Sequence, residues 1–227
     1  MDDIVSTLAL TFGVGWAAGI NLYAVILVLG LLGATGYLEL PAGLALLADP
    51  LVIAAAGFMY LVEFFADKVP GVDTGWDTLH TFVRIPAGAL LAAGAVGDVG
   101  PAVEIAAAVV GGSLAAATHA AKAGTRVLIN TSPEPFTNWG ASVAEDLGVF
   151  GGLLLALTHP GVFLVALALF VVLLVWLLPK LWRGLRQLFR SLGRLFGLGR
   201  DRPAEADESA GSVAAGPGER PSHRGQR

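Results

Sequence analysis

The stretch VFLVALALFVVLLVWLL, residues Val162–Leu178, contains no charged residue, glycine or proline. A transmembrane helix needs about 20 mostly apolar residues, so this stretch predicts a membrane span. The rest of the chain has a similar bias, with 55% hydrophobic and 14% charged residues and a mean hydropathy of +0.71. Soluble proteins contain about 25% charged residues, so this composition argues against a soluble enzyme.

Working outward from this stretch, five further segments have the apolar character of a span. They are Ile4–Gly33, Leu51–Phe65, Phe82–Val96, Ala102–Ala121 and Ala141–Leu157. We therefore predict an all-α integral membrane protein, a bundle of about six transmembrane helices that occupies residues 1–179.

The first predicted span is too long for a simple crossing. About 30 residues of helix extend about 45 Å, whereas the hydrocarbon core is about 30 Å thick. Gly13, Gly15, Gly19 and Asn21 lie near its middle. Two interpretations remain open: a helix broken near Asn21, or a tilted helix with small residues at a packing face.

The segment after the last span predicts a basic amphipathic helix over residues 180–198. Apolar residues recur there at spacings of three and four, and arginines occupy the other face. Such a helix binds anionic lipid headgroups; the alternative is that it docks on the protein itself. Residues 199–227 are rich in Pro, Gly, Ser and Glu and predict a disordered tail. The lipid-binding candidates are Arg183, Arg186, Arg190 and Arg194.

Charge asymmetry predicts the orientation. With six spans, all 14 Lys and Arg residues lie on the side of the two termini. The opposite side carries Glu39, Asp49, Asp98, Glu104 and His159, and no Lys or Arg. The positive-inside rule therefore predicts that both termini are cytoplasmic.

Two parts of the chain look alike at an offset of 63 residues: Val62–Ala92 and Thr125–Ala156. Either they are two repeated helical hairpins in the same orientation, or they show chance similarity between Ala/Gly/Leu-rich helices. Repeats are frequent in transporters and channels, where sites lie between them. The matched pairs are Thr74 with Thr137, Trp76 with Trp139, Gly88 with Gly151, Leu90 with Leu153 and Leu91 with Leu154.

Charged residues inside predicted spans are the candidate functional groups, because burying a charge in a membrane is costly. Glu63 and Asp67 form an acidic stripe, and His119, Lys122 and Arg126 form a basic one, so we expect a salt bridge between the stripes. The alternative is that these groups only lock helices together at the interface. The candidate ligand or ion pathway comprises Asn21, Glu63, Asp67, Lys68, Asp73, Asp77, His119, Lys122, Arg126, Asn130, Glu134 and Asn138.

No pattern points to catalysis or to a cofactor. The chain has no cysteine, which excludes disulfides and Cys-based metal sites. It contains no Gly-x-Ser-x-Gly, His-Glu-x-x-His or phosphate-loop motif. The net charge of −4 argues against nucleic-acid binding. We therefore expect no enzyme activity, no cofactor, no catalytic or metal-ligating residue, and no nucleic-acid partner.

Three stretches also resemble a known family: GINLYA (Gly19–Ala24), VEFFADKVPGVDTGWDTLHTFVR (Val62–Arg84) and THAAKAGTRVLINTSPEPFTNWGASVAED (Thr118–Asp146). They are similar to domain-of-unknown-function family 4126, over about residues 1–190. The resemblance implies an uncharacterised multi-pass protein of the bacterial cytoplasmic (inner) membrane, with no agreed substrate. It also implies that the polar loops matter.

Two functions follow as hypotheses. The first is a small transporter or channel, with a polar site near the cytosolic leaflet between the two hairpins. The second is a non-catalytic scaffold or assembly factor that binds anionic lipid and a cytosolic partner. Because Gly/Ala-rich helices pack closely, a homo-oligomer in the lipid bilayer is a further expectation.

Overall fold

The computed structural model describes residues 2–131 and 135–195, and within them every regular element is a helix. This confirms the all-α prediction. Predicted residue Glu134 and residues 196–227, with the predicted tail, lie outside the described residues. The elements are α1 (Asp2–Ala34), the 3-10 helix η1 (Ala42–Ala48), α2 (Pro50–Ala66), α3 (Val72–Ala95), α4 (Pro101–Ile129), α5 (Pro135–Thr158) and α6 (Pro160–Leu195).

Within the described residues, four helices are long and apolar enough to cross a membrane: α1, α4, α5 and α6. The pair η1 and α2, bent by 71°, would make a fifth span if it crosses as one unit. The predicted third span, Phe82–Val96, lies in α3, which does not meet this test. The reason is that the first half of α3 carries four buried polar or charged residues, Asp73, Asp77, His80 and Arg84. The chain is therefore a membrane protein by its apolar helices.

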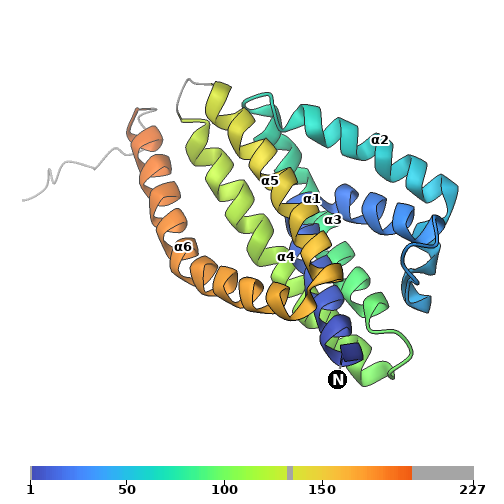
Figure 1. The fold of residues 1–227 in the computed structure, drawn as a ribbon. Coiled ribbons are helices and arrows are strands. Elements are labelled where there is room, and N and C mark those ends of the chain that lie inside the picture. Colours follow the sequence, from blue (N-terminus) through green and yellow to red (C-terminus); the bar gives the residue numbers. More distant parts are fainter. Residues whose placement is uncertain (1, 132–134, 196–227) are drawn as a thin grey trace, which may run out of the picture. The chain divides into compact units, whose positions relative to one another are not determined.

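The first helix is broken at Asn21. This residue has non-helical backbone angles (φ −147°, ψ 94°), and Figure 1 shows the two halves of α1 running in clearly different directions. The side chain of Asn21 accepts a hydrogen bond from the backbone N–H of Ala24 at 3.0 Å, so it caps the second half. The broken-helix interpretation is confirmed, and the continuous tilted helix is wrong.

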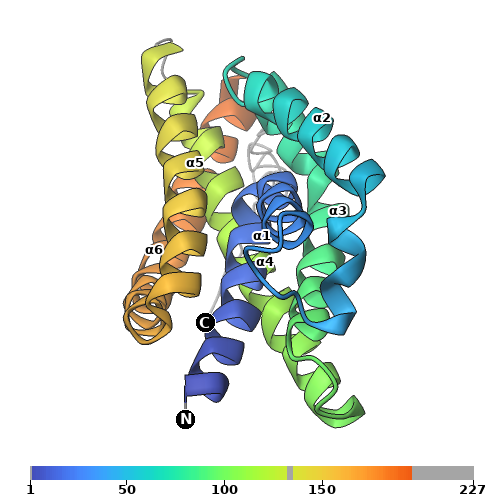
Figure 2. The ribbon, with the colours of Figure 1, turned by 45° about the vertical axis from the view of Figure 1, so that its right-hand side comes forward.

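Small residues hold the first half of α1 against its neighbours. Figure 2 shows α1 between α3 and α5, and it also packs against α4. A Cβ at Gly15 would lie 2.7 Å from the Cα of Gly111, so the backbones of α1 and α4 meet directly. Gly111 also approaches Ala92 of α3, where a Cβ would overlap the alanine methyl group. Close backbone approach through small residues is the usual packing mode of membrane helices.

The two proposed hairpins have matching boundaries. Helix α3 (Val72–Ala95) and helix α5 (Pro135–Thr158) both contain 24 residues, and their first and last residues differ by the offset of 63. The ends of α2 and α4 differ by the same offset. This agreement supports the interpretation that α2–α3 and α4–α5 repeat one helix-turn-helix pattern.

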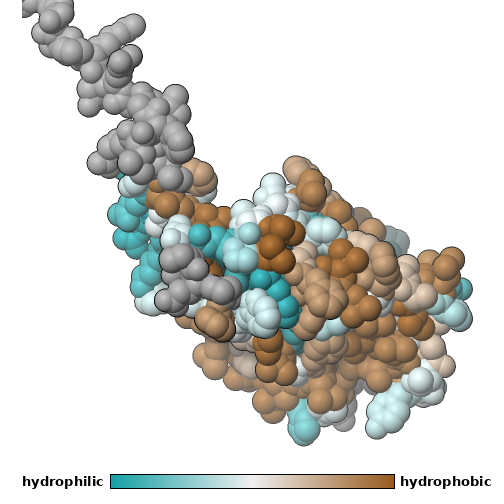
Figure 3. Space-filling view, turned by 90° about the horizontal axis from the view of Figure 1, so that it is seen from above, coloured by the Kyte–Doolittle hydropathy of each residue, from teal (hydrophilic) through white to brown (hydrophobic). Residues whose placement is uncertain are grey.

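Much of the outer surface is apolar. Figure 3 shows hydrophobic residues covering most of one face. Large side chains on several helices are more than half exposed, among them Phe58 of α2, Phe82 of α3 and Leu169 of α6. Exposed apolar area on this scale marks a surface made for lipid or for another protein.

Helix α6 does not stop at residue 179, where we predicted the end of the membrane domain. Pro179 lies inside the helix, which bends along its length (Figure 1), as expected where proline removes a backbone hydrogen bond. Beyond it, Leu181 is buried and lies beside Gly124 of α4, whereas Arg183 and Arg186 are exposed. The start of the predicted amphipathic segment thus docks on α4 through its apolar face.

Candidate functional site

Four helices contribute charged side chains to one buried group, which we call the ion-pair cluster. Spacings of four, seven and four residues place the pairs from α2, α3 and α4 on a single face of each helix. One glutamate of α5 completes the group. Its members are Glu63, Asp67, Asp77, Arg84, Lys122, Arg126 and Glu145.

Arg84 and Lys122 form the centre of the ion-pair cluster. The Arg84 guanidinium pairs with Glu63, and its Nη1 lies 3.4 Å from Asp77 Oδ1. The Lys122 ammonium lies 2.8 Å from Asp67 Oδ2 and 3.3 Å from Glu63 Oε1. The expected salt bridge between the acidic and basic stripes is therefore present.

Arg126 connects the centre of the cluster to α5. Its Nη2 lies 2.7 Å from Glu145 Oε2, and its Nη1 donates to Asn138 Oδ1 at 2.9 Å and to the carbonyl oxygen of Asp67 at 3.1 Å. The Arg126 guanidinium thus connects its own helix, α4, to the end of α2 and to α5.

The cluster is almost completely enclosed. Six of its side chains are at most 5% exposed, and only Glu145 reaches 21%. Desolvating charges is costly, so such a network persists because its members offset one another. Four carboxylates face three basic groups, which leaves one formal negative charge in excess.

The break in α1 is bonded directly to the cluster. Helix carbonyls just before a break lose their usual N–H partners. Here the carbonyl oxygen of Gly19 accepts from Arg84 Nη1 at 3.3 Å, and that of Ile20 accepts from Lys122 Nζ at 3.1 Å. Asn21 itself donates from Nδ2 to Asp146 Oδ1 at 3.0 Å. The same cations that balance the carboxylates therefore stabilise the broken backbone.

Asp73 organises a second polar group beside the cluster. Its carboxylate accepts from Asn130 Nδ2 at 2.8 Å, from Asn138 Nδ2 at 3.0 Å and from the Gly71 N–H at 2.8 Å. These bonds join the turn after α2 to the turn after α4. The predicted residues Asp73, Asn130 and Asn138 thus brace the two hairpin turns against each other.

Lys68 lies apart from the ion-pair cluster. Its ammonium donates to the carbonyl oxygen of Phe64 at 3.0 Å and lies 3.0 Å from the centre of the Phe64 ring. Burial in this turn lowers the pKa of Lys68. Its own carbonyl oxygen accepts from Trp139 Nε1 at 3.2 Å. Lys68 therefore connects the turn after α2 to α5, and it has no ion pair with a carboxylate among the described residues.

His119 does not act as a cation of the basic stripe. Its Nδ1 lies 3.2 Å from Arg84 Nη1, and because arginine can only donate, this nitrogen accepts. Its Nε2 lies 3.0 Å from the carbonyl oxygen of Asp77, to which it donates. Each ring nitrogen therefore has one role, and the contacts describe a neutral imidazole that positions Arg84.

Three contributors were absent from the predicted set: Arg84, Glu145 and Asp146. The seven-residue spacing of Asp77 and Arg84 in one helix is a signal that could have included Arg84. Glu145 and Asp146 are adjacent near the start of α5, and only the tertiary structure assigns one to Arg126 and the other to Asn21. In the part of the chain that is described, no group of three His, Cys, Asp or Glu residues is arranged to hold a metal ion.

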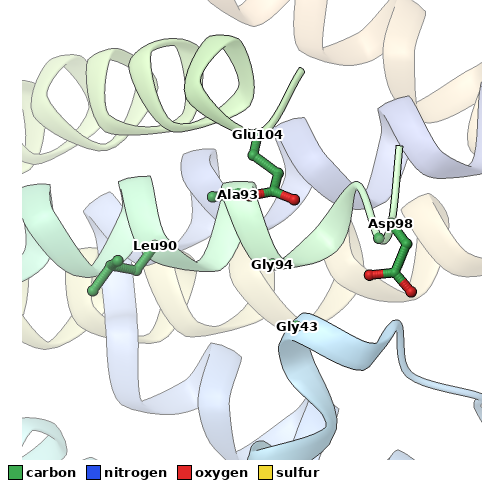
Figure 4. A pocket seen from close by; sticks show the side chains of 7 residues that line it. Gly43, Leu90, Ala93, Gly94, Asp98 and Glu104 are labelled. Carbon is green, nitrogen blue, oxygen red and sulfur yellow. The ribbon is translucent and has the colours of Figure 1, made fainter. Parts of the chain in front are cut away.

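Two pockets contain charged lining residues, one beside the ion-pair cluster and one away from it. A pocket of about 180 Å³ between α4 and α6 reaches Lys122 and Glu145. Another of about 260 Å³ lies at the far end of α3, where Figure 4 shows the carboxylates of Asp98 and Glu104 beside Gly43 and Gly94. The second pocket carries acidic groups and no basic lining residue.

A family model described as a domain of unknown function (DUF4126) matches residues 8–180. The chain belongs to this family. The matched region contains every member of the ion-pair cluster and the break at Asn21, so the site lies within the family domain. The resemblance seen in the sequence is thereby confirmed. No curated protein and no solved structure matches the chain.

Proposed function

We propose that this protein is a small transporter or channel for cations, and that its site is the ion-pair cluster at the break in α1. The observation that carries this proposal is that the cluster and the break are one bonded unit. Broken helices in membrane proteins occur where backbone lines a binding site or cavity. Buried ionisable groups at membrane depth are costly and mark ion pathways.

The preference for cations rests on the charge balance and on buried carboxylate oxygens that accept no hydrogen bond. Both carboxylate oxygens of Asp77 lack a hydrogen bond within the described residues, as do Glu63 Oε2 and Asp67 Oδ1. Each of these side chains is at least nine-tenths buried. A proton or a small cation would offset the excess negative charge and satisfy these oxygens. The acidic pocket at Asp98 and Glu104 would concentrate cations at the far end of α3.

The proposed topology has both termini in the cytoplasm of a bacterium, with α3 as a crossing helix that contributes Asp77 and Arg84 to the ion-pair cluster. The support is the placement of all 14 basic residues on one side under six crossings. A polar helix can cross when its charges face the bundle interior, and Asp73, Asp77 and Arg84 are all buried.

A second candidate is a membrane scaffold that binds anionic lipid. The observation that favours it is the exposed basic side chains of α6. Arg183 and Arg186 are exposed beside the half-exposed ring of Trp182, a combination typical of helices at the headgroup layer. Arg190, further along α6, is also exposed. The side chain of the predicted Arg194 lies outside the described residues.

The test is ion flux in proteoliposomes under imposed proton, sodium, potassium and anion gradients. Asp77→Asn removes one negative charge, together with the ion pairs of Asp77 with Arg84 and Lys122, but no hydrogen bond of this carboxylate. We expect cation flux to fall at least tenfold while the protein remains folded. Glu39→Gln, the same type of change at an exposed residue outside the cluster, should retain full flux. Unchanged flux in Asp77→Asn would contradict the proposed site, and absence of flux from folded wild type would favour the scaffold.

A further inference from the structure

The pocket between α4 and α6, which we call the lateral pocket, joins the ion-pair cluster to the apolar exterior. One wall is formed by α6, with Phe170, Leu173 and Leu177. Its charged lining residues are Lys122 and Glu145. Leu173 is half exposed, so the pocket reaches the outer surface between two helices that are apolar enough to span a membrane.

Glu145 is the more exposed of the two cluster members that line this pocket. Its side chain is 21% exposed, whereas Lys122 is 2% exposed and Arg126 is fully buried. The Lys122 ammonium is already engaged by Asp67 at 2.8 Å and Glu63 at 3.3 Å. Glu145 Oε2 itself pairs with Arg126 at 2.7 Å and lies 3.5 Å from Lys122, so a bound cation would share this carboxylate with them. The most exposed charged group in the lateral pocket is therefore a carboxylate, in a cluster that carries one excess negative charge.

We propose that the lateral pocket binds an amphiphilic cation, a substituted ammonium with a small apolar group, that enters from the side of the bilayer. The positive group would pair with Glu145, and the apolar group would pack against the leucines. The Phe170 ring also lines the pocket and is a favourable surface for a cation. An anion would meet excess negative charge, and a neutral molecule would leave it unbalanced. This inference deepens the proposed function, on which it rests, by naming the substrate class.

The test is calorimetric binding of benzyltrimethylammonium to the full chain in lipid nanodiscs, with empty nanodiscs as the blank and benzenesulfonate as the anionic comparison. We expect saturable binding of the cation and none of the anion. Glu145→Gln should weaken binding at least tenfold. Because that change also removes a partner of Arg126, a second variant, Leu173→Trp, fills the pocket from α6 without touching the cluster and should weaken binding at least tenfold.

The matched control is Leu169→Trp, which places the same ring on α6 at an exposed residue that does not line the pocket and should bind like wild type. Equal binding of benzenesulfonate, or unchanged binding in Leu173→Trp, would overturn the inference. Binding without any cation flux would uphold the pocket and contradict transport. Flux of small cations without binding would contradict the pocket and leave the proposed function standing.

Discussion

The two ends of the α3–α4 contact are held together in different ways. Toward its beginning, α3 meets α4 through charges, with Asp77 and Arg84 beside Lys122. Toward its end, the helices meet through small residues, and a Cβ at Gly111 would overlap the methyl group of Ala92. The small-residue contact is an economical way to pack membrane helices. The charged contact is not, because each buried ion pair carries a desolvation cost that close packing avoids. The same helix pair thus combines a low-cost contact with a costly one, and this difference favours a functional role for the charges.

The largest effect should come from breaking the charged end. Arg84→Ala leaves Glu63 and Asp77 buried without their guanidinium partner, which costs about 3–5 kcal/mol in buried ion pairs. It also frees the carbonyl oxygen of Gly19. We expect a large drop in the midpoint of thermal unfolding in detergent micelles. The control is Arg183→Ala at an exposed residue, which should change stability by less than about 0.5 kcal/mol. Similar midpoints for the two variants would show that the cluster contributes little to folding.

A smaller effect should follow at the small-residue end. Gly111→Ala places a methyl group against Ala92 and the carbonyl oxygen of Gly88, and overpacking of this kind costs about 1–3 kcal/mol. Gly151→Ala adds the same group at a helical position with open space around it. There the change should be neutral or stabilising by about 0.4–1 kcal/mol. The difference in the free energy of unfolding between the two variants measures the contribution of close packing at Gly111. Equal stability would show that α3 and α4 can move apart there without loss.

The smallest effect should come from the break in α1, the helix that contacts both ends of the α3–α4 interface. Asn21→Ala removes the cap on Ala24 and the hydrogen bond to Asp146, and loss of such a cap costs about 0.5–2 kcal/mol. Asn21→Ser retains a capping oxygen and should recover part of the loss. Hydrogen exchange of the amides just after the break is the direct measurement. Protection that stays the same in Asn21→Ala would mean that packing alone maintains the break.

The site was predictable to the extent that it follows from local spacing. Pairs four apart, Glu63 with Asp67 and Lys122 with Arg126, necessarily lie on one helix face, so an acidic and a basic stripe could be read directly. The role of His119 could not be read, because its charge depends on Arg84 donating to its ring. Likewise, the spacing of residues in the sequence does not predict that Glu145 pairs with Arg126 while its neighbour Asp146 accepts a hydrogen bond from Asn21.

The membrane character, the helical class and the weak point near Asn21 all follow from the sequence, because hydropathy, helix length and glycine content are properties of short segments. The direction of the break and the partners of each charge were decided only in three dimensions. Residues from α1 to α5, as far as 125 positions apart in the chain, must meet before a buried carboxylate finds its cation. Packing brings them together, because an unpaired charge in an apolar interior is too costly to persist.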